Sequence, residues 1–102
     1  MRIIDDTIIF KSANVYYYKE KSGLKPNTVR LIQEGSEVEE FIPWAYPPDW
    51  PHSPKRYIQI ENVHDATICF SREVTDVSTI ASLLGYRIFV ISWKHPEKEE
   101  RV

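Results

Sequence analysis

Five prolines crowd the middle of the chain, and they limit the possible folds more than any other feature of the sequence. The five are Pro43, Pro47, Pro48, Pro51 and Pro54. Proline has no backbone N–H and pushes the preceding residue toward extended conformations, so neither a helix nor a central strand is expected there. We therefore predict one long irregular loop over residues 33–56. Loops of this length within small domains are often functional.

Strands are predicted on both sides of this loop, where short apolar runs or alternating apolar and polar residues occur. The expected strands are 7–10, 27–32, 57–61, 66–72 and 87–93. Thr28 and Arg30 share the polar face of the second strand. Val29 and Leu31 share its other face, which we assign to the core. The last strand is apolar on both faces, so we expect it at the centre of the sheet.

The segment between the first two strands has the start and stop signals of a short helix. Ser12 is a suitable N-cap, Ala13 to Lys21 form the body, and Gly23 ends it. Residues 16–18 are all tyrosine, which also suits a strand, so a strand is the alternative. Three adjacent tyrosines cannot share one face, and we expect at least one of them in the core.

A second short helix is predicted before the last strand. Apolar residues recur there at the spacing i, i+3, i+4 and i+7, at positions Val77, Ile80, Ala81 and Leu84. Thr75 or Asp76 can cap this helix and Gly85 can end it. Together with the strands, the two helices indicate an α+β fold that is rich in β-structure.

The chain has 102 residues, which fits a single domain. We expect that domain over residues 1–93, followed by a charged tail over 94–102 that frays because it lacks core residues. Asp5 and Asp6 stand where a signal peptide needs basic and then apolar residues, and no apolar run is long enough to cross a membrane. We therefore expect a cytoplasmic protein that has no membrane span.

Charge is distributed unevenly along the chain. The net charge is −2, which argues against a general nucleic-acid binder. Residues 1–30 nevertheless hold six basic and three acidic side chains, whereas residues 31–50 hold five acidic and no basic ones. Any site for a polyanion is therefore expected near the first thirty residues.

No metal or cofactor site is predicted from the histidines and the cysteine. His52, His64 and His95 are far apart and lack a metal-ligand spacing, and Cys69 is the only cysteine. A lone cysteine within a strand is typical of a small buried hydrophobe. We therefore expect Cys69 in the core, and we expect neither metal nor cofactor.

The most informative motif lies between the first helix and the second strand. Residues 23–30 read GLKPNTVR, which is the pattern G-x-K-x-x-T-x-R. This resembles the ASCH domains, small β-barrels of the PUA-like superfamily in which a short helix precedes G-x-K-x-x-[TE]-x-R at the start of a strand. The order of the later elements is similar, so the resemblance covers most of the chain. It implies a PUA-like barrel that binds RNA or a nucleotide. Residues 35–37, Gly-Ser-Glu, depart from the Gly-Asp turn of most ASCH domains.

The chemistry of the motif residues is compatible with this implication. Lys25 and Arg30 are cations, and Arg30 shares a strand face with Thr28, so the three can converge on an anion or a carbonyl. Arginine presents a planar fork of donors that suits phosphate or carboxylate. The alternative is that both cations are solvated charges at the edge of a strand.

The resemblance also implies a possible enzyme. Some ASCH domains are small amidohydrolases that act on acylated cytidine with a Lys, a Thr and a distant Glu. By motif position, Lys25 and Thr28 match the first two. No motif residue matches the glutamate, for which Glu61 and Glu73 are candidates by elimination.

The proline-rich segment also carries aromatic rings. Trp44, Tyr46 and Trp50 are candidates for a platform on which bases stack, beside the cleft of Lys25 and Arg30. Alternatively, the rings fold back as a lid over one end of the barrel. Prolines and tryptophans at 43–54 also suit recognition of a protein partner, which is the third function that we consider.

Overall fold

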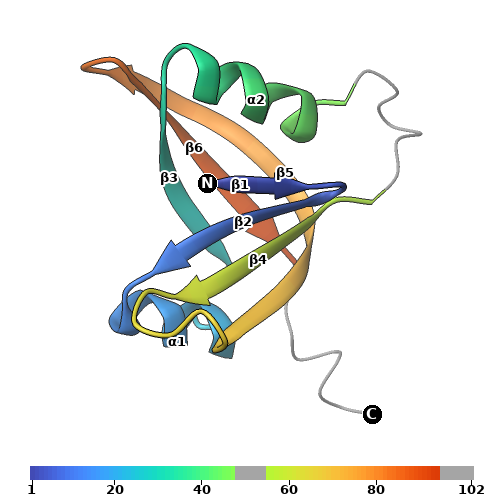
Figure 1. The fold of residues 1–102 in the computed structure, drawn as a ribbon, viewed down its shortest axis with the longest axis vertical. Helices are drawn as coiled ribbons and strands as arrows, with labels where there is room; N and C mark the ends of the chain where they lie inside the picture. The colour runs from blue at the N-terminus through green and yellow to red at the C-terminus, as the bar shows by residue number, and fades with distance from the viewer. Residues whose placement is uncertain (48–54, 95–102) are drawn as a thin grey trace.

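The computed structural model describes residues 1–47 and 55–94. Over these residues six strands and two helices form an α+β fold dominated by sheet, as predicted (Figure 1). The elements are β1 (Arg2–Ile4), β2 (Thr7–Ser12), α1 (Asn14–Ser22), β3 (Asn27–Gln33), α2 (Ser36–Ala45), β4 (Tyr57–Asn62), β5 (Cys69–Leu83) and β6 (Tyr86–Trp93). Trp50 and the predicted tail beyond Lys94 lie outside the described residues.

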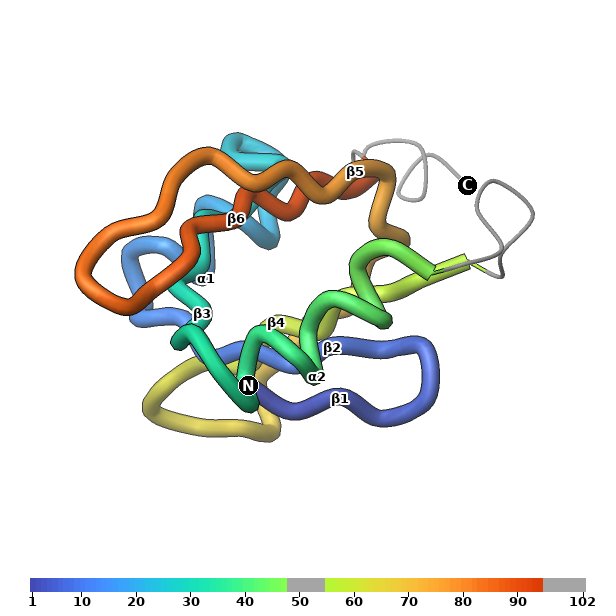
Figure 2. Tube along the Cα trace, turned by 90° about the horizontal axis from the view of Figure 1, so that it is seen from above, coloured from blue at the N-terminus to red at the C-terminus, as the bar shows by residue number. Residues whose placement is uncertain are grey.

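The strands form one sheet with the order β1-β2-β4-β5-β6-β3. Strand β5 is 15 residues long; its first part pairs with β4 and the rest pairs with β6, with irregular register near Val74 and Thr79. Irregularities of this kind increase local twist. Strand β5 therefore carries the chain from the layer of β1, β2 and β4 into the layer of β6 and β3 (Figure 2). Strands β1 and β3 are the edges, and the sheet is therefore open. The predicted barrel is not closed over the described residues.

The two helices lie at opposite ends of this curved sheet (Figure 1). Helix α2 crosses one opening between the layers, and α1 lies at the other end. Buried side chains from both layers and both helices form a single core. Its fully buried members are Ile8, Tyr17, Ile32, Phe41, Ile58, Ile60, Phe89 and Ile91. The prediction of one buried tyrosine in residues 16–18 is confirmed by Tyr17, whereas Tyr16 and Tyr18 are exposed.

Helix α2 shows that the prediction of a loop over 33–56 was wrong in its first part. Pro43 lies inside the helix, yet it faces solvent and only two helical residues follow it. The carbonyl that loses its partner to Pro43 belongs to the exposed residue Glu39, where water can satisfy it. Phe41 and Trp44 face the core, so burial outweighs the proline penalty.

The predicted helix at 77–84 was also wrong, because these residues belong to β5 and to the turn after it. Val77 is buried against the core, but Ile80 and Leu84 are exposed, so no helical apolar face exists. The two-residue turn at Leu84 and Gly85 has φ values of 51° and 82°. Positive φ at both positions is the geometry of a tight type I′ hairpin, and it sets the pairing of β5 with β6.

Two assignments of side chains to the core and one helix cap also need correction. The buried face of β3 carries Thr28, while Val29 and Leu31 are exposed. This reversal of the predicted faces is stable because the polar groups on the buried face have hydrogen-bond partners: Arg30 donates to Thr28 and to Ser12. The strand predicted from residue 66 begins only at Cys69. Cys69 is therefore the first residue of β5, and it is exposed, whereas we had expected it in the core. Ser12 ends β2 and makes no cap to α1, whose N-cap is Ala13.

Candidate functional site

The G-x-K-x-x-T-x-R segment leaves α1 and enters β3 through a tight turn. Gly23 has a φ of 87°, and its N–H bonds to the carbonyl of Glu20. This left-handed conformation favours glycine, which explains why the helix ends there. The backbone N–H of Lys25 then bonds to the carbonyl of Lys19, so the turn folds back over the last turn of α1. The motif thereby brings Lys25 next to the end of the helix.

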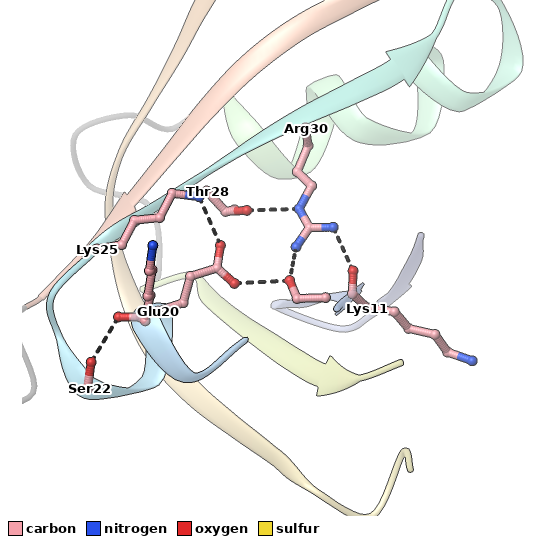
Figure 3. A network of polar contacts seen from close by, with 8 residues as sticks. Lys11, Glu20, Ser22, Lys25, Thr28 and Arg30 are labelled. Atoms are coloured by element: carbon pink, nitrogen blue, oxygen red, sulfur yellow. Dashed lines mark hydrogen bonds and ion pairs between the residues drawn. The ribbon is translucent and has the colours of Figure 1, made fainter. Parts of the chain in front are cut away.

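Glu20 is the centre of the polar cluster at this point (Figure 3). It lies in the last turn of α1 and is only 1% exposed. Its Oε1 accepts a hydrogen bond of 2.9 Å from Ser12 Oγ, and its Oε2 lies 3.5 Å from Lys25 Nζ. A buried carboxylate needs such partners, because an unpaired one would carry a large desolvation cost.

Arg30 completes the cluster from β3. Its Nε donates to Thr28 Oγ1 at 3.0 Å and its Nη2 donates to Ser12 Oγ at 2.6 Å. Ser12 thus accepts from Arg30 and donates to Glu20, and it links the two charges. The guanidinium also lies over the ring of Phe10, with Cζ 4.7 Å from the ring centroid. Burial lowers the pKa of the Arg30 guanidinium, and Glu20 acts in the opposite direction.

Arg30 also bridges the open side of the sheet. Strand β1 pairs with β2 only as far as Ile9, so in the described residues the outer edge of β2 beyond Ile9 has no strand partner. Arg30 Nη1 donates to the Lys11 carbonyl at this edge, at 2.8 Å. A side chain from edge strand β3 therefore takes the place of backbone pairing with β2. Arg30 thus has a structural role in addition to any role in binding.

A pocket of about 330 Å³ opens at this cluster. Its lining residues are Lys11, Ser12, Ala13, Tyr16, Glu20, Lys25, Thr28, Val29 and Arg30. The lining contains three cations and one carboxylate, so the pocket has an excess of positive charge. The exposed ring of Tyr16 forms one wall, with Lys25 Nζ 5.4 Å from its centroid. The pocket therefore offers positive charge beside an aromatic face.

The structure brings together three of the five predicted site residues. Lys25, Thr28 and Arg30 line the same pocket. Trp44 lies in α2 instead, where it is buried at 7% exposure and its Nε1 donates to the Asp6 carbonyl. It therefore packs in the core and is not available to stack on a base in this pocket. Trp50 lies outside the described residues, and so does most of the segment 43–54 proposed to meet a protein partner.

The carboxylate of the cluster was missed from the sequence. Glu73 pairs with Lys55 and Lys94, and Glu61 pairs with Arg2, so neither of these two candidates contacts Lys25. A signal for Glu20 was nevertheless present. It is the only acidic residue in the stretch 7–33, which carries five basic residues. A single carboxylate among several cations is the natural partner for them.

The described residues hold neither a cluster of metal ligands nor a helix that could span a membrane. No group of His, Cys, Asp and Glu side chains within 1–47 and 55–94 is arranged to hold a metal ion. Neither helix in that part of the chain is long and apolar enough to cross a membrane.

Comparison of the chain with protein-family models, with curated proteins and with solved structures gave no match. Any function proposed for the chain therefore rests on the chemistry of its own residues.

Proposed function

We propose that the chain is an ASCH-like module that binds RNA or a nucleotide in the pocket of Lys25, Thr28 and Arg30. The order of a short helix, the G-x-K-x-x-T-x-R segment and a strand supports the family resemblance. The curvature of the sheet, with β2 and β3 bridged by Arg30, is compatible with a PUA-like barrel that is open at one seam.

One observation carries this proposal: two cations converge on a single buried carboxylate beside an exposed aromatic ring. Lys25 contacts Glu20 directly and Arg30 is linked to it only through Ser12, so the single charge of Glu20 does not neutralise both cations. The remaining positive charge favours an anionic group such as a phosphate. Tyr16 offers a face on which a nucleobase can stack, an interaction of about 1–3 kcal/mol per base. A nucleotide has both features.

The test is calorimetric titration with cytidine monophosphate and with a short single-stranded RNA. Lys25→Ala should weaken binding about tenfold or more, because one charge-assisted contact is lost. Lys19→Ala is the matched control, because Lys19 is an exposed cation of the preceding helix α1 that does not line the pocket. Equal affinities of the two variants for both ligands would refute the proposal.

A second function, hydrolysis of an acylated nucleoside, is favoured by one contact. Lys25 Nζ lies 3.5 Å from Glu20 Oε2, and Thr28 lines the same pocket. Lys25 is then the nucleophile or base, Thr28 assists, and Glu20 supplies the carboxylate that the motif alone did not identify. Water is consumed, the C–N bond of the amide breaks, and the products are a carboxylic acid and the free amino base.

This second function is tested by incubating the protein with N4-acetylcytidine and following cytidine and acetate by NMR. Release that stops in Lys25→Ala and continues in Lys19→Ala would establish it. Binding of acetylcytidine without product would leave the chain a binding module.

A further inference from the structure

A second, larger hollow adjoins the proposed binding pocket. Its volume is about 610 Å³, and its lining residues are Met1, Arg2, Ile9, Phe10, Lys11, Arg30, Glu61 and Ala66. Lys11 and Arg30 line both hollows. The two hollows therefore meet at the contact that bridges the open seam between β2 and β3. A ligand that occupied both hollows would cross the surface at Lys11 and Arg30.

Glu61 gives the second hollow a specific chemical feature. The residue is 6% exposed, and its Oε2 accepts a hydrogen bond of 2.8 Å from Arg2 Nη2. Its Oε1 is buried and has no hydrogen-bond partner within the described residues. An unsatisfied buried acceptor is unfavourable, and most such atoms in proteins have a partner. A ligand that supplies an N–H donor to Oε1 would remove this cost.

The rest of the lining also fits a nucleotide. Arg2, Lys11 and Arg30 provide positive charge for a phosphate. The apolar lining residues, Met1, Ile9, Phe10 and Ala66, suit the faces of a base. Lys11 lies opposite Glu61 in the pairing of β2 with β4, so cation and acceptor are neighbours on adjacent strands. Carboxylates recognise bases by accepting from an exocyclic amino group, as in contacts to cytosine N4.

We propose that the ligand is a single strand of RNA at least two nucleotides long, which spans both hollows. Its first base occupies the pocket of Tyr16, and the linking phosphate lies near Lys11 and Arg30. The next base carries an exocyclic amino group that donates to Glu61 Oε1. Arg2, whose side chain is 59% exposed, turns from the carboxylate toward a phosphate and opens Oε1 to the base. This inference rests on the proposed function.

The first experiment compares the affinities of cytidine monophosphate, tetracytidylate and tetrauridylate by calorimetry. The tetranucleotide of cytidine should bind about tenfold or more tightly than the mononucleotide, because a second base and further phosphates are engaged. It should also bind about fivefold more tightly than tetrauridylate, the effect of one net hydrogen bond. Equal affinities of mononucleotide and tetranucleotide would overturn the inference.

The second experiment uses Glu61→Gln, which keeps the shape of the side chain. Gln59 Nε2 lies 3.5 Å from Glu61 Oε2 and keeps the amide oxygen in that position after Arg2 has turned away. The amide nitrogen therefore takes the place of Oε1 and donates where the carboxylate accepted. The preference for tetracytidylate over tetrauridylate should therefore disappear or reverse. Glu73→Gln is the matched control, because Glu73 pairs with Lys55 and Lys94 away from both hollows, and it should keep the preference.

A third variant guards against a folding defect in Glu61→Gln. Arg2→Gln removes one cation from an exposed position. It should weaken the binding of tetracytidylate and reduce the salt dependence of that binding. Thermal unfolding of each variant is recorded alongside. If neither variant alters binding of the tetranucleotides while Lys25→Ala still weakens binding of the mononucleotide, this inference fails and the proposed function stands. If no nucleotide binds to the unmodified chain, both fail.

Discussion

Residues 38–45 and 77–84 have the same hydrophobic spacing and opposite structures. Apolar residues stand at i, i+3, i+4 and i+7 in both segments, as Val38, Phe41, Ile42 and Ala45 in the first and as Val77, Ile80, Ala81 and Leu84 in the second. The first segment is helix α2, although it contains a proline. The second belongs to strand β5 and its turn, although it contains none. The spacing alone therefore does not decide between helix and strand.

Local composition accounts for part of the difference. Helix α2 has Glu37 and Glu39 in its first turn, where negative charge is favourable. The corresponding part of β5 is rich in β-branched residues, which favour strands, namely Val74, Thr75, Val77, Thr79 and Ile80. A strong strand also follows β5 after only two residues, so a hairpin competes with the helix. A strand partner that lies next in the chain therefore also favours strand over helix at 77–83.

Burial accounts for the rest. The apolar face of α2 has an opening between two sheet layers to cover, and Phe41 is fully buried there. The apolar residues of 77–84 have no common target, since Ile80 is 59% exposed and Leu84 is 89% exposed. Most helical stability in proteins comes from packing of an apolar face, so an unpacked face gives a helix little support.

The largest expected effect is a difference in the loss of stability when Phe41 and Ile80 are replaced. These two residues stand at the equivalent i+3 position of the two segments. Phe41→Ala removes a ring whose centroid lies 4.4 Å from that of Phe89, and it should lower the free energy of unfolding by about 3–5 kcal/mol. Ile80→Ala should change it by no more than about 0.5 kcal/mol, because the side chain is exposed. Urea unfolding followed by tryptophan fluorescence measures both. Similar losses for the two variants would mean that Ile80 is also packed.

A smaller effect tests why α2 tolerates its proline. Pro43→Ala restores an N–H and removes a steric conflict within the helix, so it should raise the free energy of unfolding by about 1–2 kcal/mol. The gain is less than at a helix centre because only Trp44 and Ala45 follow. Pro47→Ala, one residue beyond the end cap of the helix, serves as the control in the same urea experiment. A loss of stability in Pro43→Ala would show that the proline itself positions the end of α2.

The smallest effect concerns the turn that keeps 77–84 in a strand. Leucine is strained at the positive φ of Leu84, whereas asparagine is favoured there in a type I′ turn. Leu84→Asn should raise the free energy of unfolding by about 0.5–1 kcal/mol, as measured by thermal unfolding. Leu83→Asn, one residue earlier in the strand, should give no gain. Equal effects would show that the benefit comes from lower surface hydrophobicity and not from the turn.

The sequence was sufficient for elements with local signals. Gly23 ended α1 correctly because its left-handed conformation is a local property, and the alternation in 57–61 identified β4. It was insufficient where the result depends on distant partners. Pro43 is tolerated because it faces solvent, and the polar face of β3 is buried because Ser12 and Glu20 meet it there.

The same distinction holds for the residues of the candidate site: those with a local signal were identified, and those that depend on distant partners were not. The cations Lys25 and Arg30 were identified from a motif, and they lie in one pocket as expected. The carboxylate beside them was not identified, because Glu20 meets Lys25 only once the turn at 23–26 has folded back over the end of α1. Trp44 was assigned to the site on its residue type, but the formation of α2 carries it into the core.

Under the proposed function, the bridge that Arg30 makes across the seam couples affinity for a phosphate to local opening of the sheet between β2 and β3. A backbone ladder separates only when a strand detaches, whereas one guanidinium can release the Lys11 carbonyl by rotating about its own bonds. A phosphate that draws Arg30 away therefore loosens the β2–β3 seam, and by reciprocity a tighter seam lowers affinity for the phosphate. Amide hydrogen exchange along β3 should then respond to ligand even at residues that never touch it.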